Sequence, residues 1–252
     1  MSRRRQASRP SPCRALVTGG SGGIGQAICQ MLAAQGMEVI VHAAGNLERA
    51  QQTVRTIADN GGRASAVQFD LGDADGVAKA MAGLIESDPL AVVVHNAGIH
   101  DDAPMAGMRA EQWQRVMDVS LNGFYRVVQP ALLGMARMRW GRVIAISSVA
   151  ARLGNRGQTN YAAAKAGLHG AIISLAREMG NRGLTANTIA PGLIDTAMSK
   201  DIDSDQALQM VPAGRMGTPA EVAALVAFLC SEPAGYINAQ MIGVDGGMAP
   251  GS

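Results

Sequence analysis

Short apolar runs alternate with longer helical segments along nearly the whole chain, and this alternation is the feature that most restricts the fold. The run "LAVVVHNAG" at 90–98 reads as a strand buried on both faces of a parallel sheet. Strands are expected at 14–19, 38–43, 64–70, 90–98, 142–148, 184–192 and 240–247, and helices at 23–36, 46–62, 73–87, about 110–138 and 158–181. Such βαβ units join by right-handed crossovers. The sequence therefore predicts an α/β fold, a single doubly wound Rossmann-type domain whose parallel seven-stranded sheet has helices on both faces.

Charge is distributed unevenly between the first residues and the rest of the 252-residue chain. Residues 1–14 hold five arginines and no acid, whereas the remaining sequence carries 17 basic against 20 acidic residues. We expect residues 1–12 to be a disordered basic tail and residues 13–252 to be the domain. An electrostatic arm is the alternative for the tail. The acidic body argues against a general nucleic-acid binder.

The sequence lacks signals for secretion, membrane insertion or metal binding. No run approaches 18 apolar residues, and the first residues have no apolar stretch of the secretory type. Cys13, Cys29 and Cys230 lie far apart and form no metal-binding pattern. We therefore expect a cytoplasmic protein with reduced thiols, no membrane association and no metal.

A glycine-rich turn, "TGGSGGIG" at 18–25, lies between the first expected strand and the first expected helix. Gly19, Gly23 and Gly25 allow a tight turn and a close approach of the backbone to a pyrophosphate at the helix N-terminus. Ordinary tight turns also use glycine, but this position in a βαβ unit favours a dinucleotide site. The spacing differs from the common G-x-G-x-x-G form.

The end of the second expected strand indicates which dinucleotide binds. An acid there accepts the ribose hydroxyls of NAD, and "VHAAGN" at 41–46 has none before Glu48. A missing carboxylate favours the 2′-phosphate of NADP(H), with Arg49 and His42 as the nearby basic groups. Asp70 ends the third strand, where it can accept from the adenine amine or cap the next helix.

Tyr161 and Lys165 in "YAAAK" are four residues apart on an expected helix, so their side chains share one face. A phenol has a pKa near ~10, and an adjacent ammonium is expected to lower it. A core tyrosine beside a snorkelling lysine is the alternative. Ser148 ends the preceding strand, where its hydroxyl can donate to a substrate carbonyl, and "HNAG" at 95–98 ends a neighbouring strand. This set favours a carbonyl-reducing site.

An ordered set of short motifs resembles the short-chain dehydrogenase/reductase family from about Arg14 to Gly247. The set consists of TGxxxGxG at 18–25, NAG at 96–98, Ser148, YxxxK at 161–165, PG at 191–192, TPAEVA at 218–223 and VDGG at 244–247. Within the family, the segment "GNRGQTNYAAAKAGL" at 154–168 and the closing "YINAQMIGVDGGM" look most like those of 3-oxoacyl-[acyl-carrier-protein] reductases.

The resemblance implies an NADPH-dependent reductase of 3-oxoacyl groups bound to an acyl carrier protein, in fatty-acid or polyene- and polyketide-type biosynthesis. Tyr161 would be the general acid, Lys165 its electrostatic partner and Ser148 the group that orients the carbonyl. The resemblance also implies a homotetramer. It implies docking of the acidic carrier on Arg139 and Arg182 beside the cleft, for which solvated helix ends are the alternative.

The resemblance also implies a set of cofactor contacts spread over the strand ends. They are Gly19, Ser21, Gly23, Ile24, Gly25, Asp70, Leu71, Asn96, Ala97, Gly98, Tyr161, Lys165, Pro191, Gly192, Ile194 and Thr196. The segment 193–218 mixes polar residues with methionine and proline after a strand end. It is a candidate mobile lid over the substrate, or only a long connection.

Two positions depart from the family pattern. Ser120, in "DVSLNGFY" at 118–125, stands where the family usually has an asparagine that helps hold a water linking the lysine to solvent. Asn122 lies on another helix face and cannot take the place of that asparagine. We therefore expect Ser120 to belong to the catalytic group, although its side chain has a shorter reach. Gly22 stands where related NADPH enzymes often have arginine, which weakens the preference for NADP(H).

Two alternative functions remain open on the sequence alone. One is a dehydrogenase of a small free alcohol or ketone, sugar or steroid, since the fold does not determine the substrate. The other is a catalytically idle NADP(H)-binding sensor or partner subunit. The presence of Ser148, Tyr161 and Lys165 together argues against an idle site, and Ser120 is the feature in its favour.

Overall fold

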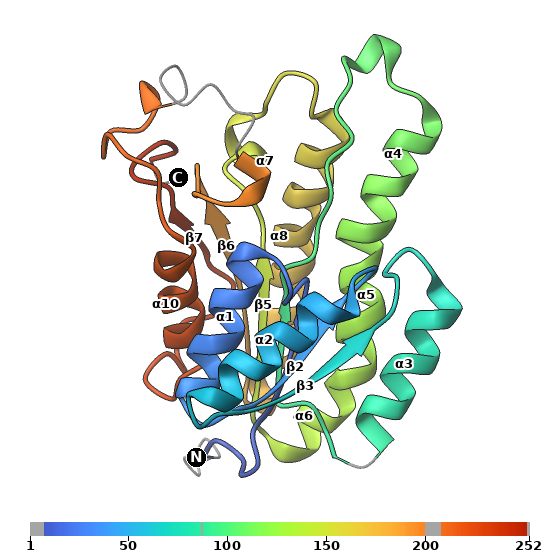
Figure 1. Cartoon of the computed structure of the whole chain (residues 1–252), viewed down its shortest axis with the longest axis vertical. Coiled ribbons are helices and arrows are strands. Elements are labelled where there is room, and N and C mark those ends of the chain that lie inside the picture. Colours follow the sequence, from blue (N-terminus) through green and yellow to red (C-terminus); the bar gives the residue numbers. More distant parts are fainter. Residues whose placement is uncertain (1–7, 87, 200–207, 251–252) are drawn as a thin grey trace.

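The computed structural model describes residues 8–86, 88–199 and 208–250, and they form a three-layer α/β/α arrangement around one parallel sheet (Figure 1). The strand order is β3-β2-β1-β4-β5-β6-β7, and every neighbouring pair is parallel. The strands are β1 (Arg14–Thr18), β2 (Glu38–Ala43), β3 (Arg63–Gln68), β4 (Val92–His95), β5 (Gly141–Ile146), β6 (Leu184–Pro191) and β7 (Met241–Val244). The predicted doubly wound fold and each predicted strand are confirmed.

Helices follow the strands at the predicted places. The α-helices are α1 (Gly23–Ala34), α2 (Leu47–Asp59), α3 (Ala74–Glu86), α4 (Ala110–Met117), α5 (Gly123–Val128), α6 (Leu132–Met138), α7 (Ala150–Leu153), α8 (Thr159–Met179) and α10 (Pro219–Leu229). Shorter helical turns are η1 (Met105–Gly107), η2 (Asp118–Asn122), η3 (Gln129–Ala131), η4 (Gly180–Arg182) and η5 (Ala197–Ser199).

Burial along the strands explains why the apolar runs are continuous in the middle of the sheet. All residues of β4, β5 and β6 are buried, whereas the edge strand β3 alternates between exposed and half-buried residues. A strand covered by helices on both faces needs apolar side chains on both, and an edge strand does not. The polar positions of "RASAVQ" therefore agree with its place at the edge.

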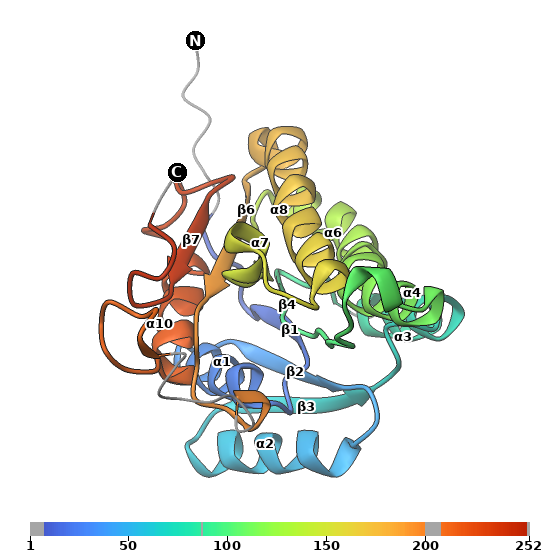
Figure 2. The same ribbon diagram turned by 90° about the horizontal axis from the view of Figure 1, so that it is seen from above.

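Helices lie on both faces of the sheet (Figure 2), and each face has its own hydrophobic core. Helices α1, α2 and α10 cover one face through residues such as Leu32 and Val226, and α3, α5, α6 and α8 cover the other through residues such as Phe124 and Ile172. The strand order reverses between β1 and β4, so the loops that follow these two strands run in opposite directions. Open α/β sheets bind ligands at such a switch point.

The predicted long helix at 110–138 is interrupted, which corrects its continuity. Residues Asp118–Asn122 form a π-helical turn, and Gln129–Ala131 form a 3₁₀ turn that contains Pro130. Proline cannot donate an intrahelical hydrogen bond, which accounts for the second break. The first break surrounds Ser120, whose carbonyl is bound by a histidine described below.

Two predicted segments, the basic tail and the candidate lid, lie only partly within the described residues. Residues 1–7 of the predicted tail lie outside them, and in the remainder the Arg9 N–H donates to the Glu232 carboxylate at 2.9 Å. The division into a tail and one domain from residue 13 stays a prediction. Of the candidate lid, residues 200–207 lie outside the description, and a backbone bridge joins Ile194 to Gly217. Within the described ranges, no helix combines the length and apolar character needed to cross a bilayer.

Candidate active site

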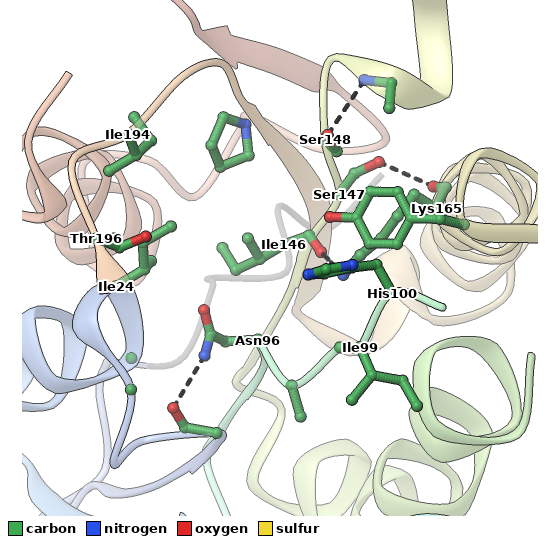
Figure 3. A pocket seen from close by; sticks show the side chains of 18 of the residues that line it. Ile24, Asn96, Ile99, His100, Ile146, Ser147, Ser148, Lys165, Ile194 and Thr196 are labelled. Carbon is green, nitrogen blue, oxygen red and sulfur yellow. Dashed lines mark hydrogen bonds between the residues drawn. The ribbon is translucent and has the colours of Figure 1, made fainter. Parts of the chain in front are cut away.

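A cleft of about 2210 Å³ lies along the carboxyl edge of the sheet. Sites for a single drug-sized ligand commonly measure ~300–1,000 Å³, so this cleft has room for a dinucleotide together with a substrate. Figure 3 shows Ile24, Ile194 and Thr196 around one part of the cleft and Ser148, Lys165 and His100 around another. Loops after β1, β3, β4, β5 and β6 all contribute to its wall.

All sixteen predicted cofactor-contact residues line this cleft, as does Ser148. The glycine turn brings the start of α1 against the end of β1. A Cβ at Gly25 would lie 2.1 Å from the Gly19 carbonyl oxygen, so only glycine permits this close packing. The N-cap residue of α1, Gly22, offers no side-chain acceptor to the first N–H groups of the helix. Backbone donors at a helix N-terminus without a protein cap fit a pyrophosphate.

Asn96 ties the glycine turn to the end of β4. Its amide Nδ2 donates to the carbonyl oxygens of Thr18 and Gly19, both at 3.1 Å. Beyond it, a Cβ at Gly98 would lie 2.8 Å from Lys165 Nζ, so a side chain there would collide with the lysine. The NAG segment therefore holds two strand ends together and leaves space for the ammonium group.

Lys165 is buried on α8 and is fixed against the end of β5. Its Nζ donates to the Ile146 carbonyl at 2.8 Å, while the Ser147 hydroxyl donates to the Lys165 carbonyl at 2.9 Å. Burial lowers the pKa of Lys165 to about 8. The two hydrogen bonds join strand and helix, so the lysine position is determined by the fold and not by a flexible side chain.

Tyr161 lies one helical turn before Lys165, with the ammonium nitrogen 5.7 Å from the centroid of its ring. Burial raises the pKa of Tyr161, a hydrogen bond with Ser148 partly offsets this, and the charge of Asp102 raises it further. The expectation that Lys165 lowers the pKa of this phenol is therefore wrong for the protein without cofactor, because desolvation dominates. A raised pKa keeps the phenol protonated, which suits a proton donor.

Ser148 and the start of α8 are held by backbone contacts. The Ser148 Oγ accepts from the Ala150 N–H at 3.1 Å. Asn160, which the sequence reasoning missed, accepts from the Tyr161 N–H at 2.8 Å and donates to the Asp101 carbonyl at 3.0 Å. This buried amide anchors the first turn of α8 to the loop after β4, and the polar residue directly before the tyrosine was its only signal.

Ser120 is buried in the π-helical turn, and its hydroxyl oxygen has no hydrogen-bond partner among the described residues. It does not line the main cleft but lies behind it: the Ser120 Oγ and Lys165 Nζ both border the space above the Gly98 Cα. Asn122 donates to Asp118 instead, at 2.8 Å. Membership of Ser120 in the catalytic group stays a prediction.

Two basic groups near the expected ribose pocket have different roles. His42, considered above as a partner of the 2′-phosphate, is buried, and desolvation lowers its pKa to about 4. It is neutral, so that role is wrong. Arg49 lines the cleft, and its guanidinium makes no ion pair or hydrogen bond within the described part of the chain, while Glu48 pairs with Arg55 at 2.5 Å. Asp70 accepts from the Gly72 N–H at 2.8 Å, so its carboxylate stabilises a turn at the cleft wall.

A second polar group at the cleft was not predicted. His100 Nδ1 lies 3.6 Å from the Asp102 carboxylate, which also accepts from the Gln158 amide at 2.8 Å. All three residues line the cleft, and they connect the loop after β4 with the loop that leads into α8. A histidine and an acid in "NAGIHDD" were the available signal.

Arg139 and Arg182 do not lie beside this cleft, which corrects that part of the prediction. Each lies two residues before a strand, β5 or β6, at the amino edge of the sheet, whereas the cleft is at the carboxyl edge. The Arg139 guanidinium donates to the Asn181 carbonyl at 3.4 Å, so the two turns are neighbours. The place of these arginines in the sequence did not reveal which edge of the sheet they occupy, because it says nothing about strand direction.

The chain has close relatives among known proteins. A family model described as "Enoyl-(Acyl carrier protein) reductase" matches residues 19–249. Curated 3-oxoacyl-[acyl-carrier-protein] reductases are 41% identical in Aggregatibacter actinomycetemcomitans (covering 92% of this chain and 98% of the relative) and 44% identical in Mycobacterium tuberculosis (94% and 92%). A solved Agrobacterium tumefaciens protein, provisionally named a gluconate dehydrogenase, matches with a TM-score of 0.91 at 32% identity, covering 95% of this chain and 97% of that one.

The parallel sheet, the glycine turn and these relatives define a nicotinamide-dependent oxidoreductase. The chain belongs to the short-chain dehydrogenase/reductase family. An idle binding protein, one of the alternatives above, is therefore set aside.

Two buried histidines predict that the protein loses stability as the pH falls from 7 to 5. Burial lowers the pKa of His42 to about 4 and that of His95 to about 3, so both rings are neutral when folded. The unfolded chain binds a proton on each ring as the pH falls through ~6.5, and stability is lost from there towards the native values. We expect a loss of about 2 kcal/mol per ring between pH 7 and pH 5 in urea unfolding.

The variant His95→Gln provides the control for this measurement. It removes one titrating ring, so the loss between pH 7 and pH 5 should fall by about 2 kcal/mol, while a smaller loss from His169, whose pKa burial also lowers, stays in both proteins. The carboxylates of Asp118 and Glu221, whose pKa values are lowered, titrate below this window because an unfolded acid titrates near ~4. An equal loss in both proteins would contradict the assignment to neutral histidines.

Proposed function

We propose that this protein reduces the 3-oxo group of acyl chains carried by an acyl carrier protein, with NADPH as the reductant. One observation carries the proposal most directly: Ser148, Tyr161 and the buried Lys165 line the same cleft, with the Lys165 Nζ 5.7 Å from the centroid of the Tyr161 ring. Identities of 41–44% to curated 3-oxoacyl-[acyl-carrier-protein] reductases support this substrate class. Fatty-acid or polyene- and polyketide-type synthesis are the pathways in which such a reaction occurs.

The residues at the cleft divide the work of a carbonyl reduction. The bound cofactor supplies a hydride to the keto carbon. Ser148 and Tyr161 donate hydrogen bonds to the keto oxygen, and Tyr161, kept protonated by burial, delivers its proton as negative charge develops there. Lys165, with its pKa lowered to about 8 and its position fixed by Ile146, stabilises the phenolate that remains. The ammonium donors also suit the hydroxyls of a ribose.

The sugar-acid relative and the description of the family model give two competing substrate classes. A 2-enoyl thioester takes up both the hydride and the proton on carbon, whereas a ketone takes up the proton on oxygen. A free sugar acid needs a polar cleft such as the one lined by His100, Asp102 and Gln158. Two donors that can meet one oxygen favour a ketone over an alkene. Turnover of carrier-bound 3-oxoacyl, carrier-bound 2-enoyl and gluconate substrates by the purified protein separates the three classes, and no turnover of any 3-oxoacyl thioester would remove the proposal.

Replacing Tyr161 by phenylalanine tests the proton donor. The loss of a positioned general acid is expected to lower kcat by about 10²–10⁴-fold, while the Kd for NADPH stays close to that of the wild type because the ring remains. Stopped-flow or steady-state absorbance of the reduced cofactor gives kcat, and fluorescence titration gives the Kd. Lys79→Ala, on the solvent side of α3, is the matched control for a surface change. Equal kcat values for Tyr161→Phe and wild type would refute the assignment.

Arg49 is the residue we propose to bind the 2′-phosphate. It is the cationic side chain at the cleft next to Ala44, Gly45 and Asn46, and the neighbouring acid in the sequence, Glu48, pairs with Arg55 instead. Arg49→Ala should raise the KM for NADPH by about tenfold, the value of one charged hydrogen bond, and leave the KM for NADH unchanged. Arg63→Ala, at the amino end of β3, removes the same charge away from the cleft. A parallel rise for both cofactors would contradict this role.

Carrier docking on Arg139 and Arg182 requires a second copy of the chain. The two arginines lie at the opposite edge of the sheet from their own cleft, so a carrier bound there delivers its acyl group to the cleft of another subunit. This arrangement agrees with the homotetramer implied by the family resemblance. A cytoplasmic location also belongs to the proposal, supported by cysteines that are all free and buried.

The double variant Arg139→Ala/Arg182→Ala tests the docking surface. The KM for carrier-bound substrate should rise about tenfold or more, since two cationic partners of an acidic surface are lost, while the KM for a free 3-oxoacyl thioester stays the same. Steady-state kinetics with both substrates give the comparison. A rise of similar size for both substrates would indicate damage to the fold instead of lost docking.

A further inference from the structure

Two buried histidines, His42 and His95, lie on either side of β1 in the last layer of the sheet below the cleft. His95 is in register with Thr18, and His42 follows the paired residues Val17 and Val41. Both rings are on the α3–α8 face: His42 contacts the Phe69 ring at 4.1 Å between centroids, and His95 contacts the Phe124 ring at 5.8 Å. These aromatic contacts prevent the imidazoles from turning away.

The hydrogen bonds of His42 determine its tautomer. Its Nδ1 accepts from the Gly19 N–H at 3.1 Å, and its Nε2 lies 2.8 Å from the Phe69 carbonyl oxygen. An N–H can only donate and a carbonyl can only accept, so Nε2 carries the proton. The ring therefore connects the first residue of the glycine turn with the loop that leads to Asp70.

The hydrogen bonds of His95 give the same tautomer by a different route. Its Nε2 lies 2.8 Å from the Ser120 carbonyl oxygen, so Nε2 carries the proton. The Thr18 hydroxyl accepts from the N–H groups of Asn96 and Ala97, both at 3.0 Å, so its own proton points to His95 Nδ1 at 3.3 Å. The ring therefore connects the β1–β4 junction with the π-helical turn behind Lys165.

We propose that His42 and His95 are positioning residues that set the two halves of the cofactor site separately. His42 holds the glycine turn in the conformation that exposes the N-terminus of α1 to a dinucleotide phosphate. His95 holds the Ser120 turn, and through it the space bordered by Ser120 Oγ, Gly98 and Lys165 Nζ at the reacting end. Neither ring touches the reacting atoms, and each acts through the backbone that it binds.

A neutral imidazole is suited to this role because it offers one acceptor and one donor at fixed separation in a dry layer. Protonation of Nδ1 would remove the acceptor for Gly19 or Thr18 and would bury a charge. For His95 the ammonium of Lys165 adds to this penalty, whereas for His42 the carboxylate of Asp70 opposes it. Both rings nevertheless keep a pKa far below neutrality because desolvation is the largest effect.

Asparagine and glutamine variants distinguish the roles of the two ring nitrogens, Nδ1 and Nε2. The side-chain oxygen of asparagine takes the place of Nδ1, and the terminal nitrogen of glutamine reaches the place of Nε2. At position 42 the acceptor matters most, so His42→Leu should raise the Kd for NADPH about tenfold, the effect of one lost hydrogen bond. His42→Asn should recover most of the affinity and His42→Gln should not, with kcat at saturating cofactor within about twofold of wild type in all three.

At position 95 the Nε2 donor to the Ser120 carbonyl matters most, so glutamine, and not asparagine, should replace histidine best. His95→Leu should lower kcat about tenfold with little change in the Kd for NADPH. His95→Gln should recover most of the rate and His95→Asn should not. His169→Leu is the matched control, because this half-buried histidine bonds the Thr188 hydroxyl at 3.3 Å and does not line the cleft; its kcat and Kd should equal those of the wild type.

The result that supports the inference is this opposite order: asparagine restores binding at 42, and glutamine restores turnover at 95. Thermal melting checks the fold, and if a leucine variant does not fold, the comparison of asparagine with glutamine still decides. The same order at both positions, or Kd and kcat changing together at each, would overturn it. The inference rests on the proposed reaction only for its rates. If no 3-oxoacyl thioester is reduced, the proposed function fails, and the His95 variants are compared on whichever alcohol or ketone the wild type converts.

Discussion

The junction between β1 and β4 is the contact on which the site depends. The sheet order reverses at this point, so the loops after the two strands leave in opposite directions and open a cleft. Thr18 and Asn96 close the junction below it, through two N–H donors to the Thr18 hydroxyl and two amide donations to the carbonyls of Thr18 and Gly19. The ladder between the two strands ends at the pair Thr18 and His95, so beyond the strand ends these bonds hold the glycine turn and the NAG segment together.

Burial is the main cause of the pKa shifts of four groups at and below the cleft. Desolvation lowers the pKa values of Lys165, His42 and His95 and raises that of Tyr161, so the protein alone favours neutral groups below the cleft. The Tyr161 phenol therefore stays protonated, while Lys165, with a pKa of about 8, responds to nearby charge close to neutral pH. A cationic nicotinamide ring would supply such a charge at one stage of the cycle. Burial of Tyr161 at the cleft thus keeps its phenol protonated until negative charge develops on the carbonyl oxygen.

Local sequence patterns were sufficient for the strands, the helices and the residues whose role depends on backbone geometry. Continuous apolar runs located β4, β5 and β6, and glycine spacing located the turn, because both patterns follow from burial and sterics within a few residues. The π-helical turn at Ser120 was not predicted: its contact with the sheet joins the Ser120 carbonyl to His95, 25 residues earlier in the chain, and local sequence patterns do not reveal such a contact. The position of Arg139 and Arg182 was misjudged for a related reason: the family resemblance located them by their place in the sequence, whereas strand direction decides which edge of the sheet a residue occupies.

Ser120 and His95 belong to one contact between the sheet and the π-helical turn, since His95 Nε2 lies 2.8 Å from the Ser120 carbonyl oxygen. The family pattern has a longer side chain at 120, and here the hydroxyl leaves a buried oxygen without a partner in the described structure. The imidazole at 95 occupies the same region from the sheet side, with its Cε1 3.5 Å from where a Cβ would lie on Gly123. A large ring below the turn and a small residue within it keep the packing filled. The backbone carbonyl of the turn, and not a side-chain amide, thereby becomes the group through which the sheet fixes the back of the lysine site.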